Sequence, residues 1–142
     1  MAMIIDVTDA VVNALNGEAF SMSFTAERRY VPNFKVHEAD GLQVSVVPRG
    51  LQRQAGSRSE DQHDYQVDVG VQKKFEDGDA TELDPLMDLV EEIADFLGDE
   101  TLDTDPVCAC VAVENGALYV QEHMREGRLF TSVLTFTYRT WR

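Results

Sequence analysis

Positive charge is scarce in this sequence of 142 residues. Twelve lysines and arginines stand against 26 aspartates and glutamates, which leaves a formal net charge of −14. Nucleic acids and anionic membranes are negatively charged themselves, so a surface this acidic repels them. We therefore expect the body of the protein to bind neither DNA, RNA nor a membrane tightly.

Cysteines and long hydrophobic runs are also few. Cys108 and Cys110 are the only cysteines, and no CxxC pair occurs. On a strand both would point to one face, where a disulfide between them forms with difficulty, so we expect small buried side chains in a reducing compartment. No apolar run approaches the roughly 18 residues of a membrane span. Residues 1–9 lack the regions of a signal peptide, which predicts a soluble protein made inside the cell.

Residues with catalytic or metal-binding chemistry do not gather into known motifs. His37, His63 and His123 are scattered, and the chain has no nucleophile motif, phosphate-binding glycine loop or redox pair. The acidic stretches EDGDATE (76–82) and DETLDTD (99–105) lack the alternating ligands of a calcium loop. We expect no catalytic residue, no cofactor and no dedicated metal site.

The carboxylates concentrate in one segment. Between Glu76 and Asp105 there are thirteen acidic residues and no lysine or arginine, so this segment carries nearly the whole net charge. Such a run is usually the solvated face of a helix. A hydrolase with paired carboxylates would need two of them in a cleft with separated pKa values, and the pattern marks no two of these acids as buried.

Hydrophobic periodicity predicts two helices. The first has Thr8 as its N-cap and ends at Gly17. The second is capped by Asp84, has Pro85 in its first turn, and ends at Gly98. Its apolar stripe faces a core, and its acidic residues lie on the opposite side.

Strands are predicted where polar and apolar residues alternate. In chain order they cover 20–30, 42–48, 65–72, 106–113, 117–123 and 129–142. Pro32 and Pro48 end the first two, and turns at Asn115–Gly116 and at 125–127 separate the last three. Together these elements predict one α+β domain over 1–142, with a largely antiparallel sheet and two helices packed on one face.

The segment 129–142 is the most sheet-prone of all. Phe130, Leu134, Phe136 and Tyr138 alternate with polar or β-branched residues. Chain ends fray unless they are tied down, so we expect this strand to lie inside the sheet.

By contrast, residues 49–64 have almost no apolar side chains, and we predict a mobile loop there. Arg49, Arg53 and Arg58 lie on this loop, with no acidic residue until Glu60. A flexible arginine loop can reach a partner that the acidic body repels. The alternative is a disordered surface loop without a binding role.

The order of these patterns resembles the tail terminator (tail completion) proteins of long-tailed bacteriophages. The resemblance is carried by IIDVTDAVVNALN, FSMSFTAERRYVPNF, LQVSVVPRG, HDYQVDVGVQKKF, LMDLVEEIADFL and RLFTSVLTFTYRTWR. These are patterns of residue character in a fixed order, with no catalytic signature, and related head–tail neck proteins share a similar plan.

The resemblance implies a single tail-terminator-like domain over 1–142 that acts as a non-enzymatic structural protein of the virion, assembled in the host cytoplasm. Such proteins form a homo-oligomeric ring, typically of six subunits, which caps the finished tail tube and joins it to the connector on the DNA-filled head. The implied partners are further copies of the chain, the tail tube protein and the connector, while genomic DNA passes through without tight binding. The alternatives are another neck or head-completion protein, or a small acidic metal-dependent hydrolase.

Partner contacts are expected at basic and aromatic residues, because arginine and tryptophan are enriched at protein interfaces. The strand over 129–142 can present its last residues to a neighbouring subunit. The alternative is that its tryptophan folds over the protein's own core. The possible contact residues are Arg28, Arg29, Arg49, Arg53, Arg58, Arg139, Trp141 and Arg142.

Overall fold

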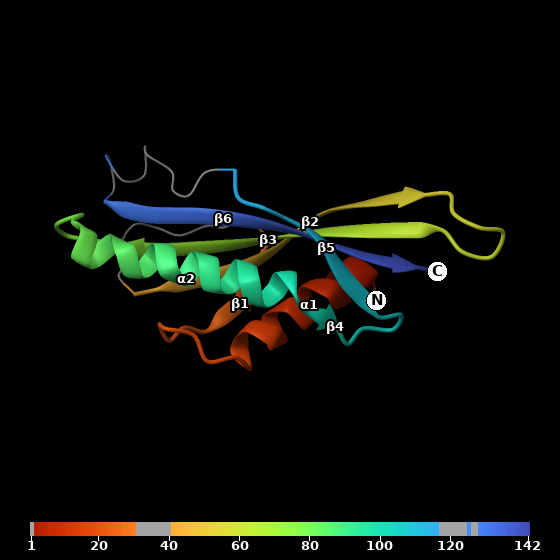
Figure 1. The fold of residues 1–142 in the computed structure, drawn as a ribbon, viewed down its shortest axis with the longest axis horizontal. Helices are drawn as coiled ribbons and strands as arrows, with labels where there is room; N and C mark the ends of the chain where they lie inside the picture. Colours follow the sequence, from red (N-terminus) through yellow and green to blue (C-terminus); the bar gives the residue numbers. More distant parts are fainter. Residues whose placement is uncertain (1, 31–40, 117–124, 126–127) are drawn as a thin grey trace.

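The computed structural model describes residues 2–30, 41–116, 125 and 128–142. Within them the chain forms helices and strands in mixed order, the α+β content that the sequence predicted (Figure 1). The elements are α1 (Met3–Asn16), β1 (Ala26–Arg28), β2 (Gln43–Gln54), β3 (Gln62–Lys74), α2 (Ala80–Gly98), β4 (Thr101–Leu102), β5 (Cys108–Glu114) and β6 (Leu129–Trp141).

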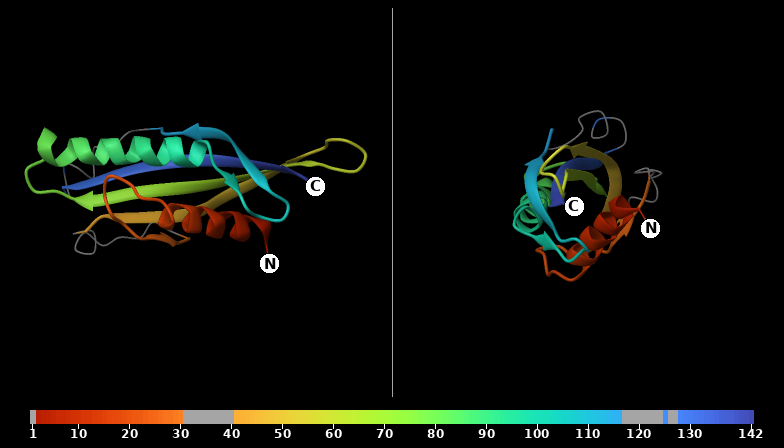
Figure 2. Two further views of the ribbon diagram at one scale, coloured as in Figure 1. Left: turned by 60° about the horizontal axis from the view of Figure 1, so that its bottom comes forward. Right: turned by 90° about the vertical axis from the view of Figure 1, so that its right-hand side faces the viewer.

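These strands form one curled sheet in the order β1-β2-β3-β6-β5-β4. The curvature is clearest in the right panel of Figure 2, which looks along the long axis of the molecule. β1 pairs with β2 in parallel, and the remaining neighbours are antiparallel. The sheet is therefore mostly antiparallel, as predicted. β6 lies between β3 and β5, which confirms that the segment 129–142 is held inside the sheet.

One face of the central strands forms the core. Every second residue of β3 from Tyr65 to Val71 is at most 3% exposed, which confirms the predicted alternation. Tyr65, Val67 and Val69 pair in register with apolar residues of β6, and Val71 pairs with Ser132. The β6 members of this layer are Phe130, Leu134, Phe136 and Tyr138.

The helices add their apolar stripes to the same core. α1 packs beside β1 and β2, and α2 packs beside β5 and β6. From α1 the core receives Val7, Val11 and Leu15, and from α2 it receives Leu86, Leu89, Val90, Ile93 and Leu97. Cys108 is buried with them and Cys110 is half-buried, and both are free thiols.

Both helices begin earlier than the sequence predicted. α1 starts at Met3, so Thr8 is not its N-cap; the side chain is buried within the helix and its hydroxyl donates to the Ile4 carbonyl at 2.6 Å. α2 starts at Ala80, so Asp84 is not its cap, and Pro85 lies in the second turn instead of the first.

The early start of α2 has a cause in its capping residues. Asp79 is the N-cap, and its side chain accepts a hydrogen bond from the backbone N–H of Glu82 at 3.1 Å. The Glu82 carboxylate reaches back to the N–H groups of the preceding turn. The spacing of Asp79 and Glu82 is that of a capping box, but the Glu82 carboxylate binds the N–H groups of residues 76–78 in place of that of Asp79. The other ends were predicted correctly, with Gly17 directly after α1 and Gly98 as the last residue of α2.

The predicted strand over 20–30 is wrong for most of its length, because only β1 is a strand there. Phe20 and Phe24 instead stack on each other with ring centroids 5.4 Å apart. Phe20 also meets Phe96 of α2 edge to face at 5.6 Å. The spacing of these aromatics therefore reflects packing against a helix rather than strand pairing. Pro32, the strand over 117–123 and most of the turn at 125–127 lie outside the described residues.

The largest correction concerns the predicted loop over 49–64. β2 continues through Pro48 to Gln54 and β3 begins at Gln62, so the connection covers only 55–61. Proline is tolerated at a sheet edge or a bulge. Here β1 pairs only with residues 44–46 of β2, and the pairing with β3 shifts register between Pro48 and Gly50.

The result is a long projection, which we call the arm and define as residues 49–66 together with 138–142. It extends away from the helices at the right-hand end of Figure 1 and of the left panel of Figure 2. Within the arm β6 pairs with β3, from Tyr65 opposite Tyr138 to Gln62 opposite Trp141.

Candidate interaction surface

Charged pairs join the strands of the arm. Arg139 binds Asp64 with two hydrogen bonds, Nε to Oδ1 at 2.8 Å and a terminal nitrogen to Oδ2 at 3.1 Å. Arg53 Nε donates to Asp61 at 2.8 Å. These bonds raise the pKa of Arg139 and lower the pKa of Asp61. Such bidentate pairs and charge-assisted bonds fix geometry, which explains how a polar segment adopts regular strands.

The connection 55–61 is closed by backbone bonds and by the tryptophan. The N–H of Asp61 donates to the carbonyl of Arg142 at 2.8 Å, and the N–H of Arg142 donates back at 3.1 Å. A Cβ atom at Gly56 would lie 2.6 Å from the Glu60 carbonyl oxygen and 3.1 Å from the Trp141 ring. Glycine therefore lets the connection approach the indole closely.

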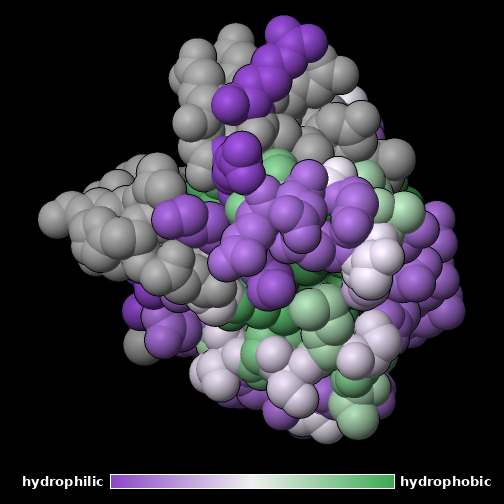
Figure 3. All heavy atoms as spheres, turned by 90° about the vertical axis from the view of Figure 1, so that its left-hand side faces the viewer, coloured by the Kyte–Doolittle hydropathy of each residue, from purple (hydrophilic) through white to green (hydrophobic). Residues whose placement is uncertain are grey.

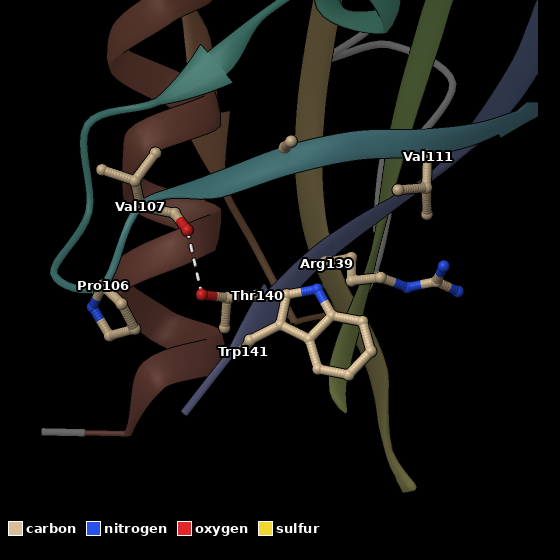
Figure 4. A pocket seen from close by; sticks show the side chains of 7 residues that line it. Pro106, Val107, Val111, Arg139, Thr140 and Trp141 are labelled. Carbon is tan, nitrogen blue, oxygen red and sulfur yellow. Dashed lines mark hydrogen bonds between the residues drawn. The ribbon is translucent and has the colours of Figure 1, made fainter. Parts of the chain in front are cut away.

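On its outer side the arm joins β5 in an open apolar groove of about 390 Å³ (Figure 4). Trp141 is 50% exposed there, and Val107 and Val111 are exposed beside it. Trp141 and Arg139 project to the same side of β6, and the Thr140 hydroxyl donates to the Val107 carbonyl at 2.9 Å. We call this surface the tryptophan groove; it is lined by Pro106, Val107, Ala109, Val111, Arg139, Thr140 and Trp141.

The other side of the arm forms a cleft of about 340 Å³ with the start of α1, and we call it the basic cleft. Arg142 donates to the Tyr65 hydroxyl at 3.1 Å, and the ring of His63 stacks on that of Tyr65 with centroids 6.3 Å apart. Leu51 is 66% exposed at this cleft. The lining residues are Ala2, Met3, Ile4, Leu51, Arg53, His63, Tyr65 and Arg142.

The structure thus brings together most of the predicted contact residues. Arg53, Arg58, Arg139, Trp141 and Arg142 belong to the arm. Arg49 lies at its root, where it donates to the Thr135 hydroxyl at 3.1 Å and to Asp68 at 3.4 Å.

Arg28 and Arg29 are not part of this surface. They lie on β1 and just after it, and form ion pairs with Asp9 at 3.4 Å and Glu27 at 2.8 Å. Sequence reasoning also missed Leu51. The available signal was that it is the one large apolar side chain in the polar stretch 49–64.

The acidic segment places most of its α2 carboxylates in solvent. Asp84, Asp88, Glu91 and Asp95 are exposed, in agreement with a solvated helix face. Glu92 differs, because it accepts a hydrogen bond from the backbone N–H of Ser21 at 3.0 Å. Within the described part of the chain, no three His, Cys, Asp or Glu side chains are grouped to hold a metal ion.

The end of the molecule opposite the arm has a different surface. Figure 3 shows hydrophilic side chains there around a smaller area of hydrophobic ones. Among residues 2–30, 41–116, 125 and 128–142, no helix has the length and apolar character to cross a membrane.

Comparison of the sequence with models of known protein families gives no match, and comparison with curated proteins gives no significant match either. The arm and its two surfaces are therefore the features that indicate a function.

Proposed function

We propose that this protein is a non-enzymatic tail terminator of a long-tailed bacteriophage. Copies of the chain form a ring, six in the family that it resembles, which caps the completed tail tube and joins it to the head connector in the virion. The observation that carries the proposal is the tryptophan groove: a half-exposed tryptophan beside exposed aliphatic residues, on an arm of paired strands that projects from the body.

Exposed tryptophan beside exposed aliphatic side chains is typical of a contact surface, because tryptophan is among the residues that contribute most to binding energy. Trp141 is exposed while its neighbour Tyr138 is fully buried. The strand thus anchors itself in the core through one side chain and leaves the other available for a partner.

We further infer that both helices pack on one face of the sheet, as the sequence predicted. Their buried residues join one core with the apolar face of β3 and β6, which supports this arrangement. The far end of the arm extends beyond both helices (Figure 1), so that a neighbouring copy, the tail tube protein or the connector can reach it. In this proposal genomic DNA passes through the ring without tight binding, and no membrane is involved.

The proposal is tested on tail tubes grown from the tube protein of the same genome. Purified protein is added, and electron microscopy records the fraction of tube ends that carry a ring and the tube lengths. We expect rings at one end of the tubes and an end to growth. Tubes that elongate as they do without the protein would contradict the proposal.

Two variants make this experiment specific. Trp141→Ala removes the exposed indole and should leave the ends uncapped while the protein remains folded. Tyr30→Ala is the matched control, because it removes an aromatic ring that is 68% exposed but lies outside the arm; it should cap tubes normally.

A further inference from the structure

The basic cleft is unusual in a protein of net charge −14. Arg53, Arg142 and His63 line it together with apolar and aromatic side chains. The start of α1 lies at the same cleft, and a helix N-terminus carries partial positive charge. Arg53 has a partner in Asp61 but keeps 67% of its side chain exposed. A ligand of opposite charge can therefore reach it.

Leu51 is an apolar side chain that lines this cleft beside the two arginines. It pairs with Tyr65 across the hairpin, yet 66% of its surface is exposed while that of Tyr65 is 3%. A small anion would leave the leucine uncovered. A protein segment with carboxylates covers both the arginines and the leucine.

The chain itself contains a surface with the complementary charge. The segment 76–105 holds thirteen acidic residues and no basic one, so of the net −14 only −1 remains for the rest of the chain. On α2 the exposed acids follow at intervals of four, three and four residues, which places them along one side of the helix over about 16 Å. We call this row the acidic ridge: Asp84, Asp88, Glu91 and Asp95.

The acidic ridge and the basic cleft of one molecule do not face each other. α2 begins at the left-hand end of Figure 1, opposite the arm, and ends near the middle of the molecule, whereas the cleft lies between the arm and the start of α1. A contact between these two surfaces must therefore join two molecules. Contacts between two different surfaces of the same chain generate rings when the rotation closes.

We infer that the basic cleft binds the acidic ridge of α2 in a second copy of this chain. This inference rests on the proposed ring and identifies the two surfaces that meet in it. Charge complementarity selects the pairing, because ridge against ridge brings like charges together. Arg53 and Arg142 take the carboxylates, and Leu51 packs against the helix between them.

The test is a charge exchange, followed by sedimentation equilibrium over a range of concentrations. The cleft variant is Arg53→Glu, and the ridge variant carries Asp88→Arg and Glu91→Arg. Each alone should weaken self-association by at least about tenfold, in the range for a lost interfacial charge pair. An equal mixture of the two variants should restore association, because the reversed surfaces are again complementary.

Two further variants keep the test decisive. Arg58→Glu makes the same charge change in the connection 55–61, outside the cleft, and should associate like wild type. Leu51→Glu places a carboxylate in the cleft without removing a hydrogen bond that holds the arm. It should weaken association even if the Arg53 variant disturbs the arm itself.

The outcomes separate this inference from the proposed function. If wild type associates and the cleft and ridge variants do so equally well, or if the mixture fails to restore association, the cleft–ridge pairing is wrong while the ring remains. If the Arg58 variant loses as much self-association as the Arg53 variant, the effect is one of overall charge, and the cleft–ridge pairing is also wrong. Wild-type protein that never associates, with or without tubes, would contradict the ring itself.

Discussion

At the scale of single residues, Glu82 helps to determine where α2 begins. Its carboxylate accepts hydrogen bonds from the backbone N–H groups of Glu76, Asp77 and Gly78 at 3.0, 2.6 and 3.2 Å. Gly78 has a positive φ of 69°, which glycine adopts without strain. One side chain thus satisfies the turn before the helix and helps to fix where the helix begins.

Glu82→Gln should therefore destabilise the protein in a pH-dependent way. The backbone hydrogen bonds, that of Glu76 foremost, lower the pKa of Glu82 below its ordinary value of 4.5. Because the pKa of Glu82 is lower in the folded than in the unfolded protein, its ionised carboxylate stabilises the fold at pH values above the ordinary pKa. This stabilisation is lost as the pH falls through the folded-state pKa. Urea unfolding should show a less stable variant at pH 7, and a smaller difference at pH values below the ordinary pKa.

Glu91→Gln is the matched control, since Glu91 lies on the exposed side of the same helix. Its unfolding curve should stay close to that of wild type at pH 7. An equal loss of stability in both variants would show that the change at Glu82 acts through overall charge and not through its hydrogen bonds to the preceding turn.

At the scale of elements, local patterns predicted the body of the fold and missed the arm. Val67, Val69 and Phe136 alternate with polar residues and are buried on one face, so the periodicity alone identified β3 and β6. In the arm the stabilising pair Arg139–Asp64 joins residues 75 positions apart. No local signal can show such a pair, and local patterns place Asp64 in the predicted loop although they place Arg139 in a predicted strand.

The same limit applies to helix starts and to the candidate surface. Asp79 and Glu82 have the spacing of a capping box in the sequence, but Pro85 suggested a later start, because proline is common in a first turn. Trp141 and the arginines could be named from residue type. Their division between the tryptophan groove and the basic cleft depends on the register of β3 with β6, which only the structure gives.

Limited proteolysis should distinguish the arm from a mobile loop. Trypsin cleaves after arginine, and Arg58 lies in the connection 55–61 while Arg53 lies in the paired part of β2. We expect cleavage after Arg58 well before cleavage after Arg49 or Arg53, because regular pairing protects the backbone. Mass spectrometry of the early fragments identifies the sites. Equally fast cleavage at all three would favour the loop that the sequence suggested.

At the scale of the whole molecule, the acidic charge sets what the proposed ring would present to DNA. Six copies would carry 6 × −14 = −84 formal charges. Duplex DNA carries one negative charge per roughly 1.7 Å of its axis. In the proposed ring this charge would repel the genome along the channel and offer no site at which it would be retained.

Fluorescence anisotropy with a labelled duplex tests this property. At physiological salt we expect no measurable binding, whether the protein is a monomer or a ring, because the acidic segment outweighs the arginines of the arm. Binding at micromolar concentration or tighter, with a steep decrease as salt increases, would indicate a nucleic-acid-binding role instead of a passive conduit.

The central claim is that copies of this chain assemble into a closed ring, and the mass of the assembled particle tests it most directly. Native mass spectrometry should detect a discrete species beside the 15.9 kDa monomer. Six copies, the number typical of the family that the sequence resembles, make about 95 kDa. Trp141→Ala should shift the population toward the monomer. A 15.9 kDa monomer alone at every concentration, or an open series of masses without a preferred size, would contradict the account.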